Sequence, residues 1–331
     1  MKNYSALLKY APFVLIGIFA LGCITFKVNF LALSANVLIC ALVCGVLWVI
    51  NSEYRSSKTK TAFALSVGAV LLCLMCAVIY LAPDNNVQYI AIAMAGLMDV
   101  MRVMLMAVSF ILLAVQFKED KLIRNLAWSL AGLLILSAIP WHNMLYALGF
   151  DYYQYVGIKK VIIFSASYIS GSTWYAAICV LALFCHFYCL KDRIRESVTL
   201  NALEILSVIS VVIAVLFSST LWCVRLDYSS ASTASYSLGG AGIFPVVSLG
   251  IAVMLAAIIS VFIHNRIMAL VSGALLIIWP FGACVKFYLS IPSFTEYYIY
   301  NPIICAASAF IGGVLLVVGT VLKMQKVKVM Y

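Results

Sequence analysis

Two ionisable residues with helical spacing, Asp99 and Arg102, stand in the otherwise apolar run 87–117. Residues three apart share one face of an α-helix, so the carboxylate can neutralise the guanidinium. A charged side chain at the centre of a membrane costs about 2.5–3.5 kcal/mol on insertion scales, and such residues often mark proton or substrate pathways. Two interpretations follow: a structural ion pair facing the interior of a helix bundle, or a pair that handles a proton or substrate beside a cavity.

Hydroxyl groups are concentrated in the run 161–190, which indicates close helix packing or a polar cavity. In a transporter, the candidate substrate-binding residues are Ser165, Tyr168, Ser172 and, in a later run, Lys286. Glu204 is a weaker candidate, because its position near the end of a run lets its side chain reach the membrane interface. Ala309 and Gly313 form a small-xxx-small pair, which predicts close helix packing.

Histidines and cysteines give little sign of a metal centre. His142, beside Trp141 in a loop, can exchange protons at the membrane surface, whereas His186 and His264 lie on different runs. This arrangement does not fit a haem held by two histidines, so we expect no haem. Cys73 and Cys76 have CxxC spacing without a second pair, and we interpret them as packing residues, with no metal expected. No motif for nucleotide, zinc or nucleophilic chemistry is present.

Composition indicates the elements that must position these residues. Of 331 residues, 66% are hydrophobic and 10% are charged, against about 25% charged in soluble domains. This excludes a soluble enzyme and predicts an all-α bundle of transmembrane helices in one domain, 1–331. The net charge of +10 lies in short clusters without a basic stripe and interleaved aromatic residues, so we expect no nucleic acid as partner.

About ten apolar runs are candidate spans, and lipid is the expected surrounding partner. The run 125–139 is short and can extend past Pro140, and 87–117 is long enough to be tilted or broken. The ten runs are 10–26, 31–50, 61–82, 87–117, 125–139, 161–190, 198–224, 241–263, 267–289 and 302–322.

Positive charge orients these runs. With the N-terminus inside, 15 of the 21 Lys and Arg fall on the inner side and 5 on the outer side. This bias predicts a multi-pass protein of the cytoplasmic (inner) membrane with both termini in the cytoplasm. The first run, which ends at Cys23, is similar to a secretory signal, and we expect it to remain as an uncleaved helix.

Loop positions and short stretches between residues 31 and 290 carry a resemblance to a known family. Basic segments at Arg55–Lys60, Lys118–Arg124 and Lys191–Arg195 alternate with an aromatic loop at 140–157 and a Ser-rich loop at 228–237. Together with Phe164–Gly171 and Phe287-Tyr288, this order resembles the membrane anchor subunit of dimethyl sulfoxide reductase-type molybdoenzymes. The chain departs from the family at Tyr80-Leu81-Ala82, where a His-Leu-Gly stretch is typical.

The resemblance implies a quinol-interacting anchor. Asp99, in the region of the family's acid, would accept a proton from a menaquinol-type molecule while Arg102 holds its charge state. Tyr80 and His142, with the adjacent Trp141, would contact the quinone oxygens. Electrons would pass to iron–sulfur and molybdenum subunits docked on the outer face.

Two other function classes remain open. A secondary transporter of a small metabolite would couple to protons through Asp99 and Arg102. A structural or assembly protein of the membrane would need no ligand of its own.

Overall fold

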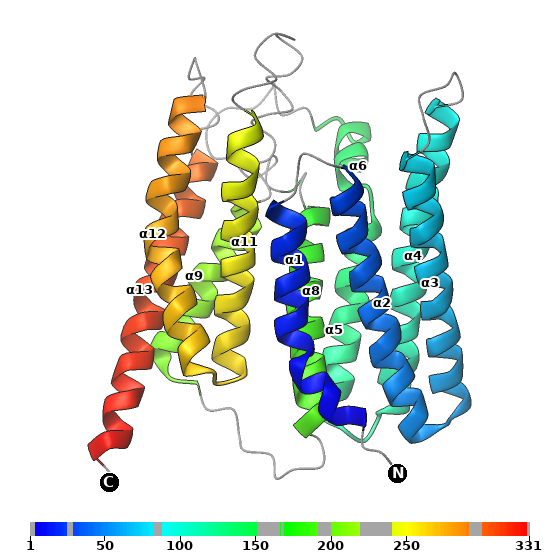
Figure 1. The fold of residues 1–331 in the computed structure, drawn as a ribbon, viewed down its shortest axis with the longest axis horizontal. Coiled ribbons are helices and arrows are strands. Elements are labelled where there is room, and N and C mark those ends of the chain that lie inside the picture. The colour runs from blue at the N-terminus through cyan, green and yellow to red at the C-terminus, as the bar shows by residue number, and fades with distance from the viewer. Residues whose placement is uncertain are drawn as a thin grey trace. The chain divides into compact units, whose positions relative to one another are not determined.

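Every regular element in the described part of the chain is a helix. The computed structural model describes residues 4–24, 29–81, 88–150, 166, 169–190, 200–218, 240–290 and 300–329, and no strand occurs among them. In chain order (Figure 1), the elements are a 3₁₀ helix η1 (Tyr4–Tyr10), α1 (Ala11–Ile24), α2 (Asn29–Tyr54), α3 (Ser57–Leu81), α4 (Gln88–Gln116), α5 (Lys121–Ala138), α6 (Trp141–Ala147), α8 (Ile169–Leu190), α9 (Ala202–Ser218), α11 (Gly240–Phe262), α12 (Arg266–Ser290) and α13 (Tyr300–Val329).

Each of the ten apolar runs contains a helix, and six helices hold a segment long and apolar enough to cross a membrane. These segments are Ala35–Tyr54, Ser57–Ile79, Gly96–Gln116, Lys121–Ala138, Ile169–Leu190 and Ile303–Gln325. The described parts of α1, α9, α11 and α12 hold shorter apolar segments. The prediction of an all-α membrane protein with several spans is therefore confirmed.

Two open questions about individual runs are answered by the backbone. The long run 87–117 forms the single helix α4, without a break. The short run 125–139 does not continue past Pro140: α5 ends at Ala138, Ile139 is extended, and α6 starts separately. The reason is steric, because proline disfavours helical geometry in the residue before it.

The chain divides into two compact units, and each is described by itself. The first unit comprises 1–139 and 176–195, and the second comprises 140–175 and 196–331. Helix α8 therefore contributes its second half to the first unit and its beginning to the second. A single domain over 1–331 stays a prediction.

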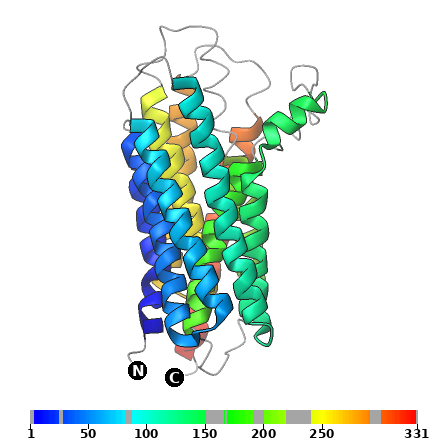
Figure 2. The same ribbon diagram turned by 90° about the vertical axis from the view of Figure 1, so that its right-hand side faces the viewer.

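In the first unit, helices α1 to α5 pack each against the next in chain order (Figures 1 and 2). The second half of α8 adds an aromatic cluster to this unit. Phe184 meets Phe110 of α4 edge-on with ring centroids 5.7 Å apart, and Tyr188 meets Phe117 at 5.8 Å. The Tyr188 hydroxyl donates to Glu53 Oε2 at 2.7 Å, which ties α8 to the end of α2.

Helix starts in this unit carry polar caps. Ser56 and Thr59 bond reciprocally, each side-chain oxygen accepting from the other residue's N–H at 3.1 Å, and Asp120 Oδ1 accepts from Leu122 N and Ile123 N at 3.1 and 3.2 Å. These bonds satisfy amide groups that have no partner within the helix. They fix the first turns of α3 and α5.

In the second unit, α13 packs against α9 and α12, and α11 packs against α9 and α12. Glycines permit the closest approaches. A Cβ on Gly313 would lie 2.8 Å from Gly273 O of α12, and one on Gly312 would lie 3.3 Å from Ser207 O of α9. The predicted packing role of Gly313 is therefore confirmed, and Ala309 is fully buried on the same helix.

Candidate functional sites

Helix α4 brings Asp99 and Arg102 together as their spacing predicts. Arg102 Nη2 lies 2.7 Å from Asp99 Oδ1, and Arg102 Nε donates to the same oxygen at 3.0 Å. Both contacts use one carboxylate oxygen, so the second oxygen, Oδ2, is outside this pair. The neighbouring residues on α4, such as Met101 and Val103, are apolar.

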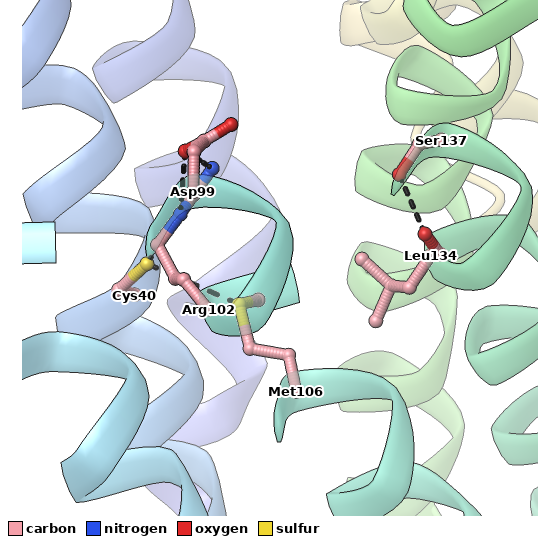
Figure 3. Close-up of polar contacts among 6 residues, drawn as sticks. All are labelled: Cys40, Asp99, Arg102, Met106, Leu134 and Ser137. Carbon is pink, nitrogen blue, oxygen red and sulfur yellow. Dashed lines mark hydrogen bonds and ion pairs between the residues drawn. The ribbon is translucent and has the colours of Figure 1, made fainter. Parts of the chain in front are cut away.

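The guanidinium also contacts sulfur from a neighbouring helix. Arg102 Nη1 donates to Cys40 Sγ of α2 at 3.2 Å, and the Cys40 thiol lies 3.9 Å from Met106 Sδ (Figure 3). The side chain of Arg102 lies between Asp99 and Cys40 in this view. The cation is thus fixed from two sides, by a carboxylate on its own helix and by a sulfur 62 positions earlier.

The two members of the pair differ sharply in exposure. The side chain of Arg102 is 4% exposed, whereas that of Asp99 is 55% exposed. The guanidinium therefore belongs to the packed interior of the first unit, and the carboxylate faces outward from it. A charge-compensated carboxylate on an apolar surface can accept a proton or a hydrogen bond from a molecule that approaches that surface.

Hydroxyl groups elsewhere in the first unit serve packing. Ser109 Oγ donates to Ala62 O of α3 at 3.0 Å and to Leu105 O at 2.8 Å, which joins α3 to α4. On α5, Ser137 Oγ donates to Leu134 O at 2.8 Å (Figure 3). Neither contact involves the Asp99–Arg102 pair.

The other residues singled out in the sequence are placed as follows. Ser172 is buried, and its Oγ donates to Leu216 O of α9 at 3.2 Å, so its hydroxyl joins two helices. Trp141 and His142 begin α6 in the second unit. Tyr80 stands near the end of α3 and Lys286 stands in α12, while the side chains of Tyr80, His142 and Lys286, and the whole of Ser165 and Tyr168, lie outside the described part.

A second charged site lies in the second unit, where α9 begins and α13 nears its end. Glu204 and Asn201 form a capping box: Asn201 Oδ1 accepts from Glu204 N at 2.7 Å, and Glu204 Oε2 accepts from Asn201 N at 3.0 Å. Lys323 Nζ lies 3.0 Å from Glu204 Oε1. Here the carboxylate is the buried partner, with its side chain 7% exposed, and the lysine is 36% exposed.

This ion pair borders a cavity of about 280 Å³. His264, Asn265 and Arg266, where α11 is followed by α12, also line it, and Asn265 Oδ1 caps α12 by accepting from Met268 N at 3.0 Å. The apolar lining residues are Val261, Ala269 and Leu316. The polar lining residues are Glu204, Ser260, His264, Asn265, Arg266, Thr320 and Lys323.

Sequence reasoning identified only Glu204 among these lining residues. Arg266 and Lys323 counted only among the 15 cations expected on the inner side, and no role was assigned to Cys40 from the sequence. A local signal existed for Asn265, which precedes a new apolar run as helix caps do. No local signal pairs Glu204 with Lys323 or Cys40 with Arg102, because each contact joins helices far apart in the chain.

Comparison of the sequence with family models and with curated proteins, and of the structure with solved structures, finds no match.

Proposed function

We propose that the chain is the quinol-interacting membrane anchor of an oxidoreductase complex. The observation that carries the proposal is the Asp99–Arg102 pair, in which a buried guanidinium compensates the charge of an outward-facing carboxylate. In this proposal the first unit offers an apolar wall to a menaquinol-type molecule. Asp99 accepts a quinol proton as electrons leave toward iron–sulfur and molybdenum subunits.

The position of Asp99 along α4 supports this proposal. Asp99 and Gln116 are 17 positions apart, which is about 26 Å along a helix. A hydrocarbon core is about 30 Å thick. If Gln116 stands at the inner boundary, the carboxylate lies close to the outer boundary, where a quinol headgroup and partner subunits would meet it.

The same proposal includes the finer topology. We take all ten helical runs as spans, place both termini in the cytoplasm and assign the chain to the cytoplasmic membrane. The charge bias of the loops supports this orientation. Reactivity of single cysteines introduced at Lys118 and Tyr146 toward an impermeant thiol reagent in intact cells tests it, with labelling expected at Tyr146 alone.

The decisive experiment is oxidation of a menaquinol analogue by the complex purified with this chain. Asp99→Asn keeps the size of the side chain and removes the proton-accepting charge, so we expect quinol oxidation to fall at least about hundredfold. Glu119→Gln, which changes an exposed acid in the turn before α5, is the matched control. Wild-type oxidation by an inserted Asp99→Asn variant would exclude Asp99 from the reaction, and purification without redox subunits would contradict the anchor function itself.

A second candidate function is favoured by the polar cavity of the second unit. A quinone headgroup needs a largely apolar cleft, whereas this cavity carries Glu204, Arg266 and Lys323. Such a lining suits a polar metabolite, as in a secondary transporter coupled to protons through Asp99 and Arg102. Proton-driven uptake of a solute into vesicles that contain the chain alone, abolished by Asp99→Asn, would favour this function over the anchor.

A further inference from the structure

The cavity of the second unit contains a buried donor that the packing of the unit does not use. Thr320 lines this cavity and is 4% exposed. No hydrogen bond joins its hydroxyl to any residue that the structure describes. By contrast, Ser260 in the same lining donates to Ala257 O at 2.7 Å. The Thr320 hydroxyl is open to this cavity, so it can donate to or accept from a molecule that binds there.

The charge of the lining favours an anion. Lys323 Nζ lies 3.0 and 3.4 Å from the two oxygens of Glu204, so this carboxylate is already compensated. Within the described ranges no acid pairs with Arg266, which also lines the cavity. One cation is therefore left over, and a guanidinium binds phosphate or carboxylate oxygens with two parallel hydrogen bonds.

The start of α12 also favours an anion in this cavity. Arg266 is the first residue of a helix of 25 residues. Asn265 Oδ1 already accepts from Met268 N, so the cap accounts for one amide of the first turn and leaves those of Arg266 and Ile267. The remaining amides and the helix dipole favour a negative charge at this end.

We infer that this cavity is a binding site for a phosphate group, held by Arg266, the hydroxyl of Thr320 and the first turn of α12. Its volume of about 280 Å³ far exceeds the roughly 10–15 Å³ that one water requires. A phosphate with a few attached atoms fits, while a drug-sized molecule does not. The inference holds whether the chain is an anchor or a transporter.

Two sources supply this chemistry: the headgroup of an anionic lipid, or a phosphate compound from solution. The full chain, purified in a neutral detergent, is titrated separately with phosphatidylglycerol, with phosphatidylcholine and with glycerol phosphate, and binding is read by native mass spectrometry and thermal stabilisation. Phosphatidylglycerol binding alone identifies a lipid site, and binding of glycerol phosphate identifies a soluble ligand. If neither phosphatidylglycerol nor glycerol phosphate binds above the phosphatidylcholine background, the inference is wrong.

Variants locate the binding. We expect Arg266→Gln to weaken it at least about tenfold, because a charge-assisted contact is lost. Thr320→Val should weaken it several-fold, while Thr320→Ser, which keeps the hydroxyl, should bind as the wild type does. Arg124→Gln, which removes an arginine from the first turn of α5 in the other unit, is the control and should bind normally. Equal affinity in Arg266→Gln, or an equal loss in Arg124→Gln, would show that any anion bound lies elsewhere.

Discussion

The two units hold a charge pair in opposite ways. In the first unit the cation Arg102 is buried and the acid Asp99 is exposed, on one helix. In the second unit the acid Glu204 is buried and the cation Lys323 is the more exposed partner, on two helices. The buried member is the one that its unit fixes with additional bonds, to Cys40 in one case and to Asn201 in the other. The exposed member is therefore the one that a molecule outside the unit can reach.

The units also differ in how closely their helices approach. Cβ atoms added at several glycines of the first unit would meet nothing within 4 Å, namely at Gly45, Gly96 and Gly132. In the second unit they would meet backbone or side-chain atoms at once, namely at Gly273, Gly312 and Gly313. The contacts of α13 with α9 and α12 in the second unit therefore need glycine, whereas a Cβ on the described glycines of the first unit would come no nearer than 3.4 Å to a neighbour.

The largest effect is expected where the exposed acid of the first unit is removed. Asp99→Leu leaves Arg102 buried beside Cys40 without a counter-ion, which should lower the free energy of unfolding by about 3 kcal/mol. Thermal unfolding in detergent, followed by tryptophan fluorescence, measures the loss. Adding Arg102→Leu should restore most of it. If the double variant is no more stable than Asp99→Leu, the two residues are not coupled.

The next largest effect compares alanine substitutions at a tightly packed glycine of the second unit and at an open glycine of the first. Gly313→Ala places a methyl group 2.8 Å from Gly273 O, so α12 and α13 must separate, at a cost of about 2 kcal/mol. Gly132→Ala in α5 meets open space and should be neutral or stabilising by up to about 1 kcal/mol. Melting temperatures that move in the same direction for both variants would contradict the proposed difference in packing.

A smaller effect tests how the second unit holds its buried acid. Glu204→Gln keeps a side-chain oxygen that can accept from Asn201 N but removes the ion pair with Lys323, at a cost of about 1 kcal/mol. Glu204→Ala also removes the bond from Asn201 N, the half of the cap that the Glu204 side chain supplies, and should cost about 2 kcal/mol. Equal losses for the two variants would mean that the ion pair, and not the cap, accounts for the burial of this residue.

The smallest expected effect is a gain in stability, and it concerns the positive φ angles that both units have after a helix. Arg55 and His264 end α2 and α11 with positive φ angles of 44° and 52°, a conformation that favours glycine. Arg55→Gly should therefore stabilise the chain by roughly 0.5–1 kcal/mol, seen as a higher melting temperature. Destabilisation would show that the Arg55 side chain, and not its backbone geometry, matters in that turn.

Local features of the sequence were sufficient for much of this structure. The apolar runs identified the helices because length and hydropathy act locally, and the spacing of Asp99 and Arg102 identified their contact. The spacing could not reveal which of the two residues is buried, because burial depends on the neighbouring helices. The cavity was not predicted because it combines the beginning of α9, the α11–α12 turn and the end of α13.

The separation of partners along the chain has a consequence for biogenesis. Asp99 meets its counter-ion three residues later, so that pair enters the membrane already neutral. Glu204 must wait for Lys323, 119 positions further on. At a synthesis rate of about 5–20 residues per second, the wait is roughly 6–24 s. During that interval the Glu204 carboxylate of a nascent chain is without this counter-ion, so α9 reaches its final packing only after α13 has been made.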